Sequence, residues 1–333
     1  MKSVLLGQKD TLMAVYPLEV RQALGREAGL NPDFYLEVDE LSNFREQLRD
    51  TRFIFSTWGM PQLSEDDITR FFPSLEAVFY AAGSVQYFAR PLLKSGIRVF
   101  SAWGANAVPV AEFTLAQILL ANKGYFALSG LYSRGGRPAL ESHKVDYPGN
   151  YKCKVGIIGA GMIGKLVIKL LRNHNLEILV FDPFLPEEKA EELKVEKVDL
   201  PTLFASCQTV SNHLANNAQT EGTLNYDLFS RMLPGAVFIN TGRGAQVVES
   251  DLCRLLIERP DVTAVLDVTW PEPPEEGHLF YTLPNVVMTP HIAGSIGNER
   301  QRMSKYMLEE FRRYINNDTC LFEVTELMLT TLA

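Results

Sequence analysis

The segment Lys154-Val-Gly-Ile-Ile-Gly159-Ala-Gly161-Met-Ile-Gly164 joins an apolar strand to a glycine-rich turn and is the most informative part of the sequence. The residues after Gly161 repeat apolar side chains at spacings of 3, 4, 7 and 8, which predicts an amphipathic helix. A second apolar strand follows at Glu177–Phe181 and ends in Asp182. This succession of strand, glycine turn, helix, strand and acidic residue is typical of a βαβ unit that binds a dinucleotide.

Each glycine of the turn has its own predicted task. Gly159 permits the tight turn, Gly161 lets the backbone approach a pyrophosphate, and Gly164 lets the helix pack against the strand. The free N–H groups at the start of the helix favour an anion. A glycine-rich turn without a ligand is the alternative. The predicted cofactor contacts here are Gly159, Gly161, Met162, Ile163, Gly164 and Asp182.

Asp182 predicts which dinucleotide binds. A carboxylate at this place accepts hydrogen bonds from the ribose hydroxyls and repels a 2′-phosphate. The residues that follow, Asp182-Pro-Phe-Leu-Pro, contain no Arg or Lys that would attract such a phosphate. We therefore expect NAD rather than NADP.

Apolar runs alternate with amphipathic stretches along nearly the whole chain, which indicates parallel sheets built from βα units. Two such series are separated by a long helix at Val108–Lys123 and a loop at Arg134–Tyr151. The sequence thus predicts two doubly wound α/β units and a final helix at Asn298–Asn316. The strand candidates are Ser3–Leu6, Phe53–Ser56, Ala77–Ala81, Arg98–Phe100, Lys154–Ile158, Glu177–Phe181, Thr209–Asn212, Ala236–Asn240, Val262–Val268 and Val286–Met288; further helix candidates are Leu18–Ala28 and Ser64–Phe71.

Composition narrows the class of protein. A chain of 333 residues with 46% hydrophobic content has material for two domains. The net charge of -8 lacks the basic footprint of nucleic-acid binding. The four cysteines form no CxxC pair and, with the histidines, no zinc spacing, so no metal is expected. We see no signal peptide and no apolar run of about 18 residues, which favours a cytoplasmic protein without a membrane span.

Several separated motifs resemble the D-isomer-specific 2-hydroxyacid dehydrogenase family, over about Phe53 to Asn316. They are the glycine turn, Val-Ala-Glu-Phe-Thr-Leu at 110–115, Phe238-Ile-Asn-Thr-Gly-Arg243-Gly244, Leu266-Asp267-Val-Thr-Trp-Pro-Glu272-Pro273 and Thr289-Pro-His291-Ile-Ala-Gly-Ser. The resemblance implies an NAD-binding Rossmann domain at 102–292, inserted into a flavodoxin-like substrate (catalytic) domain formed by 1–101 and 293–333. It also implies a cleft between the two and a homodimer with Val108–Lys123 near its interface.

The resemblance assigns the catalytic roles to Arg243, Glu272 and His291. Arg243 would hold the carboxylate of a 2-keto acid by paired hydrogen bonds. His291 would be the acid/base that protonates the oxygen when hydride reaches C2. Glu272 would bond the other ring nitrogen and favour the protonated imidazole. From the residues alone, the alternatives are a surface arginine, a loop or core histidine and a surface carboxylate.

Further contacts are implied in the same way. Asp267 resembles the family's aspartate near the nicotinamide carboxamide, and Thr241 and Gly242 would line the nicotinamide side. His213 resembles a residue beside the cofactor, with a structural histidine as the alternative. The glycine turn at Gly83 and Ser84 would bind the substrate carboxylate, together with Arg243 and His291. Two departures stand out: Phe88 replaces an aspartate common in relatives, and Trp270 replaces a smaller or acidic residue.

The resemblance thus implies an NAD-dependent oxidoreductase that interconverts a small 2-keto acid and the D-2-hydroxy acid. Two alternatives remain. One is a non-catalytic NAD(H)-sensing interaction protein of the same fold. The other is a formate dehydrogenase, which is disfavoured because such relatives typically carry glutamine where this chain has Glu272. The particular 2-keto acid is not specified by the sequence.

Overall fold

The structure, a computed structural model, describes residues 2–141 and 143–330. The chain separates into two compact units. Unit 1 runs up to Asn106 and resumes at Ser295, and unit 2 is Ala107–Gly294. The boundaries implied by the family resemblance are 101/102 and 292/293. Unit 2 is therefore inserted in the chain between the two segments of unit 1.

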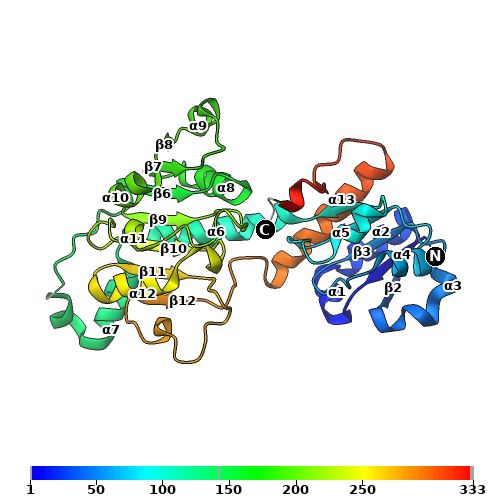
Figure 1. Cartoon of the computed structure of the whole chain (residues 1–333), viewed down its shortest axis with the longest axis horizontal. Coiled ribbons are helices and arrows are strands. Elements are labelled where there is room, and N and C mark those ends of the chain that lie inside the picture. Colours follow the sequence, from blue (N-terminus) through cyan, green and yellow to red (C-terminus); the bar gives the residue numbers. More distant parts are fainter. Residues whose placement is uncertain (1, 142, 331–333) are drawn as a thin grey trace. The chain divides into compact units, whose positions relative to one another are not determined.

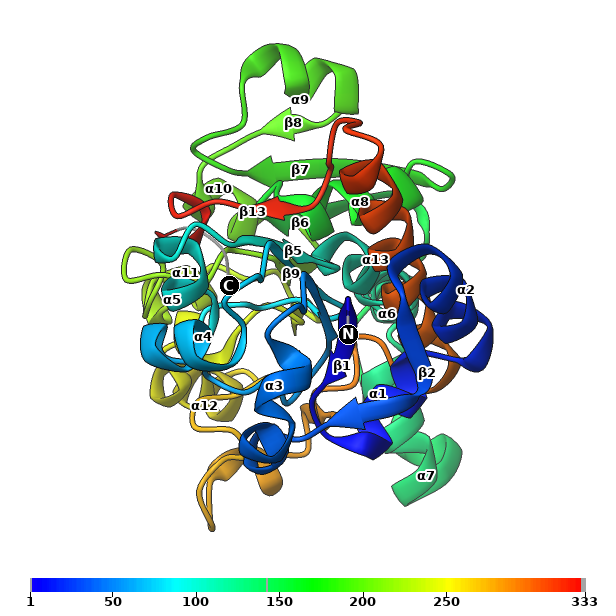
Figure 2. The same ribbon diagram turned by 90° about the vertical axis from the view of Figure 1, so that its right-hand side faces the viewer.

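Unit 1 is built on a six-stranded sheet with the order β13-β5-β4-β3-β1-β2 (Figures 1 and 2). All pairs are parallel except β13 with β5. The order 2-1-3-4-5 of its parallel strands is the flavodoxin-like one. The strands are β1 (Ser3–Leu6), β2 (Leu30–Leu36), β3 (Phe53–Ser56), β4 (Ala77–Tyr80), β5 (Arg98–Ser101) and β13 (Glu323–Val324). The helices are α1 (Lys9–Val15), α2 (Leu18–Ala28), η1 (Val38–Phe44), α3 (Arg45–Leu48), α4 (Glu65–Phe71), α5 (Ala89–Lys94), η4 (Gly297–Glu299), α13 (Arg300–Ile315) and η5 (Met328–Thr330).

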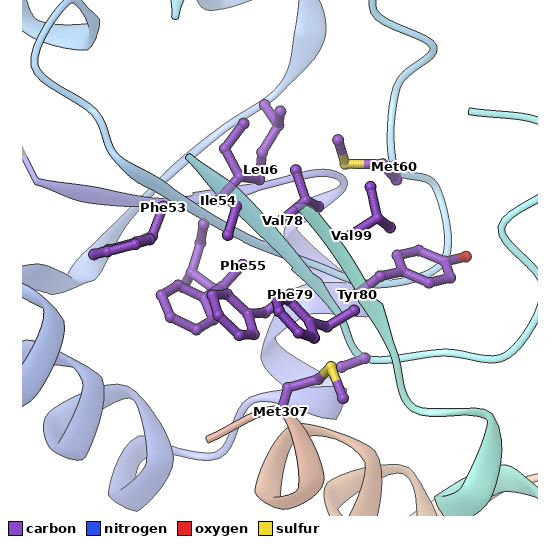
Figure 3. Packing of buried hydrophobic residues seen from close by; sticks show 14 of the residues in the cluster. Leu6, Phe53, Ile54, Phe55, Met60, Val78, Phe79, Tyr80, Val99 and Met307 are labelled. Atoms are coloured by element: carbon purple, nitrogen blue, oxygen red, sulfur yellow. The ribbon is translucent and has the colours of Figure 1, made fainter. Parts of the chain in front are cut away.

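An aromatic cluster fills the core of unit 1 beneath α13. Phe55 and Phe79 lie side by side on neighbouring strands, with ring centroids 5.2 Å apart (Figure 3). Phe311 of α13 meets Phe53, Phe55 and Phe79 edge to face, at centroid distances of 5.2, 5.5 and 5.4 Å. Edge-to-face packing adds to the free energy gained by burying such rings. The C-terminal helix is therefore part of the core of unit 1.

Replacing Phe311 by alanine should lower the free energy of unfolding by about 3–5 kcal/mol, since the ring is fully buried and leaves a cavity. Urea unfolding followed by circular dichroism would measure the loss. Phe184→Ala is the matched control, because that ring is 85% exposed and its removal should change little. A Phe311→Ala protein as stable as wild type would contradict this packing.

Unit 2 holds a seven-stranded parallel sheet with the order β12-β11-β10-β9-β6-β7-β8 (Figure 1). Counted from β6, this is the Rossmann order 3-2-1-4-5-6 with one more strand. The strands are β6 (Tyr151–Ile158), β7 (Asn175–Phe181), β8 (Glu196–Lys197), β9 (Thr209–Asn212), β10 (Val237–Asn240), β11 (Thr263–Leu266) and β12 (Val286–Met288). The helices are α6 (Trp103–Asn122, which begins in unit 1), α7 (Tyr125–Glu141), α8 (Met162–Leu171), α9 (Glu187–Leu193), α10 (Leu200–Ser206), α11 (Tyr226–Phe229), η2 (Gly244–Gln246), α12 (Glu249–Glu258) and η3 (Leu279–Tyr281).

Alternate residues of the central strands of unit 2 enter two different cores. In β10, Phe238 packs in a core with residues of α10, α11 and α12. Its neighbours Val237 and Ile239 pack in a second core, with residues of α6, α8 and α9. Successive side chains of a strand point to opposite faces, so both faces of the sheet are covered. The prediction of two doubly wound α/β units is confirmed.

One expectation about the connecting region needs correction. The segment predicted as a loop from Arg134 is helical as far as Glu141, in α7 with a kink at Gly136 (φ 61°); Ser142, in the same predicted loop, lies outside the described residues. In addition, α6 is long and apolar enough to cross a membrane by length and composition, although 56% of its apolar window is buried inside the structure. Ala111, Ile118 and Ala121 of α6 belong to the second core of unit 2, as in a core helix.

Candidate active site

His291 and Glu272 form a close pair in unit 2. His291 lies after β12, and its Nδ1 is 2.7 Å from Oε1 of Glu272. The pair uses Nδ1 and leaves Nε2 as the ring nitrogen that can exchange a proton with a ligand. His291 has a left-handed backbone with φ of 53°, which is uncommon for a residue other than glycine. Such a conformation persists only where neighbouring bonds hold it.

Asp267 supplies those bonds. Its buried carboxylate accepts hydrogen bonds from Thr289 Oγ1 (2.6 Å), Ile292 N (2.8 Å) and Ala293 N (2.9 Å). Its carbonyl oxygen also accepts from His291 N at 3.0 Å. Asp267 therefore anchors the segment that carries the histidine. Its contact with a nicotinamide carboxamide stays a prediction.

Arg243 lies after β10, at the start of η2. Burial lowers the pKa of its guanidinium below the ordinary value, and the nearby carboxylate of Glu272 opposes this shift. Its Nη1 donates to the carbonyl oxygen of Gly242 at 2.7 Å. A Cβ on Gly244 would lie 2.0 Å from the carbonyl carbon of Thr269. The arginine segment thus packs directly on the loop that leads to Glu272.

The glycine turn has the geometry expected for a dinucleotide. Gly159 has φ of +90°, and a Cβ there would lie 2.7 Å from the carbonyl oxygen of His213. A Cβ on Gly164 would lie 2.0 Å from the carbonyl oxygen of Gly159. A Cβ on Gly161, the N-cap of α8, would meet nothing within 4 Å. Two glycines are therefore required by the protein's own packing, and the third borders open space at a helix N-terminus, where phosphates bind.

Met162 and Ile163 are the first two residues of α8, so their backbone N–H groups belong to this N-terminus. Asp182 directly follows β7 and bonds to the turn itself. Its carboxylate accepts from Ala160 N at 2.7 Å and from Phe184 N at 2.8 Å. Ionised carboxylates have about four lone-pair sites. Asp182 can therefore brace the turn and still accept from ribose hydroxyls.

His213 follows β9 and is only 8% exposed. Its Nε2 pairs with Ser211 Oγ at 2.9 Å, and among the described residues its buried Nδ1 has no hydrogen-bond partner. An unpartnered buried nitrogen is costly unless a ligand or water completes it. His213 thus combines the structural role with an open position that suits the cofactor. Burial lowers the pKa of His213 from 6.5 to about 3.

This shift predicts a pH dependence of stability. Between these two pKa values, the unfolded chain binds a proton at His213 that the folded chain does not. The stability that His213 contributes is therefore complete above pH 6.5 and is lost as the pH falls towards 3. The slope from this one group is at most about 1.4 kcal/mol per pH unit.

Urea unfolding of the cofactor-free protein at several pH values between 5 and 7 would measure the slope. His213→Gln should reduce this slope relative to wild type. An unchanged slope in His213→Gln would contradict the prediction.

The remaining predicted residues are distributed between the units. Thr241 is buried beside Gly242, and its Oγ1 lies 3.0 Å from Thr114 Oγ1 of α6. Gly83 and Ser84 follow β4 in unit 1, where Ser101 Oγ donates to the carbonyl oxygens of Ala82 and Gly83. The contact of Gly83 and Ser84 with a substrate carboxylate stays a prediction. The structure brings together Arg243, Glu272 and His291 in unit 2.

The two departures from the family pattern differ in environment. Phe88 is buried at the N-cap of α5, 4.8 Å from the ring of Tyr80. The phenyl ring therefore belongs to the core of unit 1. Trp270 is 68% exposed, and its backbone N–H donates to Glu249 Oε1 at 2.7 Å.

Three buried amides beside Arg243 were not singled out from the sequence. Asn212 and Asn240 each end a buried strand, and Gln246 ends η2. A polar residue at the carboxyl end of a buried parallel strand faces the region where ligands bind in such sheets. The position at the end of a strand therefore marks the two asparagines in the sequence. No sequence pattern marks Gln246.

Together, the doubly wound sheet, the glycine turn at α8 and the carboxylate after β7 define a dinucleotide-binding protein. Residues 116–293 match the model of the D-isomer specific 2-hydroxyacid dehydrogenase, NAD binding domain, and the chain belongs to this family. Its cofactor is NAD, as expected from the sequence.

Among curated relatives, YoaD of Bacillus subtilis is 33% identical over 243 residues, covering 71% of this chain and 66% of YoaD. The D-3-phosphoglycerate dehydrogenase of Archaeoglobus fulgidus is 30% identical over 215 residues, covering 65% of this chain and only 40% of that protein. The match thus spans less than two thirds of the length of each. A phosphoglycerate oxidoreductase structure from Rhizobium etli superposes with a TM-score of 0.78 at 22% identity, covering 98% of this chain and 99% of that one, which shows the fold.

Proposed function

We propose that this protein is an NAD-dependent oxidoreductase that interconverts a small 2-keto acid and the corresponding D-2-hydroxy acid. The observation that carries the proposal is the 2.7 Å pair between His291 and Glu272, in the same unit as Arg243 and the glycine turn. This set supplies an acid/base, a carboxylate-binding cation and a dinucleotide site.

His291 is the proposed acid/base. In the reductive direction its Nε2 donates a proton to the C2 oxygen of the substrate, and in the oxidative direction it accepts that proton. Glu272 holds Nδ1, which fixes the orientation of the ring. Asp267 holds the left-handed backbone of His291, and this backbone fixes the position from which the imidazole ring extends.

Arg243 is the proposed substrate cation. A guanidinium recognises a carboxylate by two parallel hydrogen bonds, which orients the substrate as well as binding it. Burial of Arg243 strengthens such a bond, because charges interact more strongly away from water.

When bound, NADH supplies the hydride that reduces C2. The residues that would hold it are the N-terminus of α8 with Gly159, Gly161 and Gly164, the carboxylate of Asp182, and the open Nδ1 of His213. Thr241, Gly242 and Asp267 would face the nicotinamide end.

A screen of 2-keto acids with NADH, with NADPH as cofactor control, tests the proposed function. Glyoxylate, hydroxypyruvate, pyruvate and larger branched or sugar-derived keto acids form the panel, and chiral chromatography of the product tests the D configuration. Tight NADH binding without turnover across the panel would overturn the proposal in favour of an NAD(H)-sensing protein. Oxidation of formate, assayed in parallel, would instead favour the formate dehydrogenase.

Asp182→Ala should weaken NADH binding about ten-fold and narrow the preference for NADH over NADPH. The carboxylate bonds the turn and would accept from the ribose, and its charge opposes a 2′-phosphate. Fluorescence titration with both cofactors would measure the two dissociation constants. Asp227→Ala, a surface carboxylate of α11, serves as the control. An unchanged NADH to NADPH ratio would remove Asp182 from the site.

We also propose a cytoplasmic homodimer, with α6 and α7 at its interface. The proposal is supported by α7, in which no residue is buried and Tyr125 and Tyr132 are 51% and 61% exposed. Light scattering coupled to size-exclusion chromatography would test it, and a monomer at micromolar concentration would contradict it.

A further inference from the structure

The geometry points to Gln246 as a positioning residue that fixes the backbone of Arg243 and, with the same side chain, the loop His213–Ala215. The inference deepens the proposed function and rests on it, because it gives Gln246 an effect only through the substrate carboxylate that Arg243 binds.

All four polar positions of the Gln246 amide are used, and the side chain is fully buried. Its Oε1 accepts from Asn212 Nδ2 at 2.6 Å and from Arg243 N at 3.2 Å. Its Nε2 donates to the carbonyl oxygens of Leu214 at 2.9 Å and Ala215 at 3.0 Å. One side chain therefore bridges the arginine segment and the loop after β9.

Asn240 holds the carbonyl side of the same residue, Arg243. Its Nδ2 donates to the carbonyl oxygen of Arg243 at 3.2 Å, and its Oδ1 accepts from Gly242 N at 3.1 Å and Asn212 Nδ2 at 3.0 Å. Both the N–H and the C=O of Arg243 are thus bound by buried side-chain amides. These two amides end β10 and η2, and Asn212 at the end of β9 donates to both of them. The backbone of Arg243 is therefore fixed relative to the strands of the sheet.

A positional role explains why an amide stands here. Burying polar atoms costs free energy that their hydrogen bonds only offset, so the net stability gained from this network is modest. The network holds the point from which the guanidinium extends. Paired hydrogen bonding to a carboxylate is sensitive to that point, since a displacement of about 1 Å can cost about 10²-fold in rate.

The decisive measurement is the binding of a substrate-like carboxylate. Gln246→Leu should weaken oxamate binding to the NADH-loaded protein at least about ten-fold and raise KM for the best keto acid similarly, with a smaller change in kcat. Asn285→Leu is the matched control. Its buried amide also donates to backbone carbonyls, of Leu256 (3.0 Å) and Val262 (2.8 Å), but away from Arg243. It should lower thermal stability and leave both constants unchanged.

A double mutant separates positioning from a general weakening. Because Gln246 acts through Arg243, adding Gln246→Leu to Arg243→Lys should raise KM by much less than it does in wild type. Full multiplication of the two effects, or equal KM changes in Gln246→Leu and Asn285→Leu, would overturn the inference. If Gln246→Leu does not fold, Asn240→Ser is measured in its place with the same expectation, and an unchanged KM would overturn it.

The same data distinguish the two proposals. One outcome would contradict only the positioning role of Gln246 and leave the proposed function supported. In it the wild type turns over, Arg243→Lys raises KM, and Gln246→Leu changes neither KM nor oxamate binding. Unchanged oxamate binding in Arg243→Lys would sink the substrate role of Arg243 and, with it, the inference.

Discussion

Replacing His291 by alanine should lower kcat about 10³-fold while leaving the dissociation constant of NADH within about two-fold of wild type. General acid catalysis contributes about 10²–10⁴-fold, and all of it is lost with the imidazole. The glycine turn and Asp182 retain their own hydrogen bonds in this variant, so the cofactor site should persist. Steady-state kinetics and fluorescence titration of NADH would supply the two constants.

His174→Ala is the matched control for this variant, since His174 follows α8 and lies outside the Glu272 pair. It should retain the wild-type kcat. Wild-type turnover in His291→Ala would refute the assignment of the acid/base. A parallel loss of NADH binding would instead show that the variant had disturbed the fold.

The second large effect concerns Gly164 and Gly161 of the same turn. Alanine at the first should lower stability, and alanine at the second should weaken cofactor binding. Gly164→Ala should lower the melting temperature by about 10 °C or prevent folding, because its Cβ would lie 2.0 Å from the carbonyl oxygen of Gly159. Gly161→Ala should melt like wild type, since its Cβ would meet nothing within 4 Å. It should still weaken NADH binding at least about ten-fold, because the methyl group occupies the side from which a pyrophosphate approaches.

Differential scanning fluorimetry without cofactor and titration with NADH separate these outcomes, and each variant serves as the control for the other. A stable Gly164→Ala protein would mean that helix α8 and the turn are not packed as described. Unchanged NADH affinity in Gly161→Ala would place the pyrophosphate elsewhere.

Local patterns predicted most strands of the fold and several of its longer helices. Several elements have the predicted bounds, among them Ser3–Leu6, Leu18–Ala28, Thr209–Asn212 and Val286–Met288. Buried strands and amphipathic helices can be recognised from the spacing of their apolar residues. β2 (Leu30–Leu36) was missed because Pro32 and Asp33 interrupt its apolar pattern, which edge strands tolerate. β13 has only two residues and no periodicity to read.

The loop predicted from Arg134 is helical to Glu141 for a related reason. Gly135, Gly136 and Pro138 are strong signals for a break, and the structure has the break only as a kink at Gly136.

The dinucleotide turn and the two α/β series follow from the sequence alone, and family motifs in it pick out Arg243, Glu272 and His291. These features can be recognised within a few consecutive residues. The contacts of these residues are seen only in the folded chain. Three sets of contacts form there: the 2.7 Å pair of His291 with Glu272, the hydrogen bonds of Asp267 to the histidine segment, and the bond from Arg243 N to Gln246. The first two join the ends of strands that are far apart in the chain. Parallel strands bring their carboxyl ends to one edge, and hydrogen bonding there depends on register and packing, which no short stretch of sequence encodes.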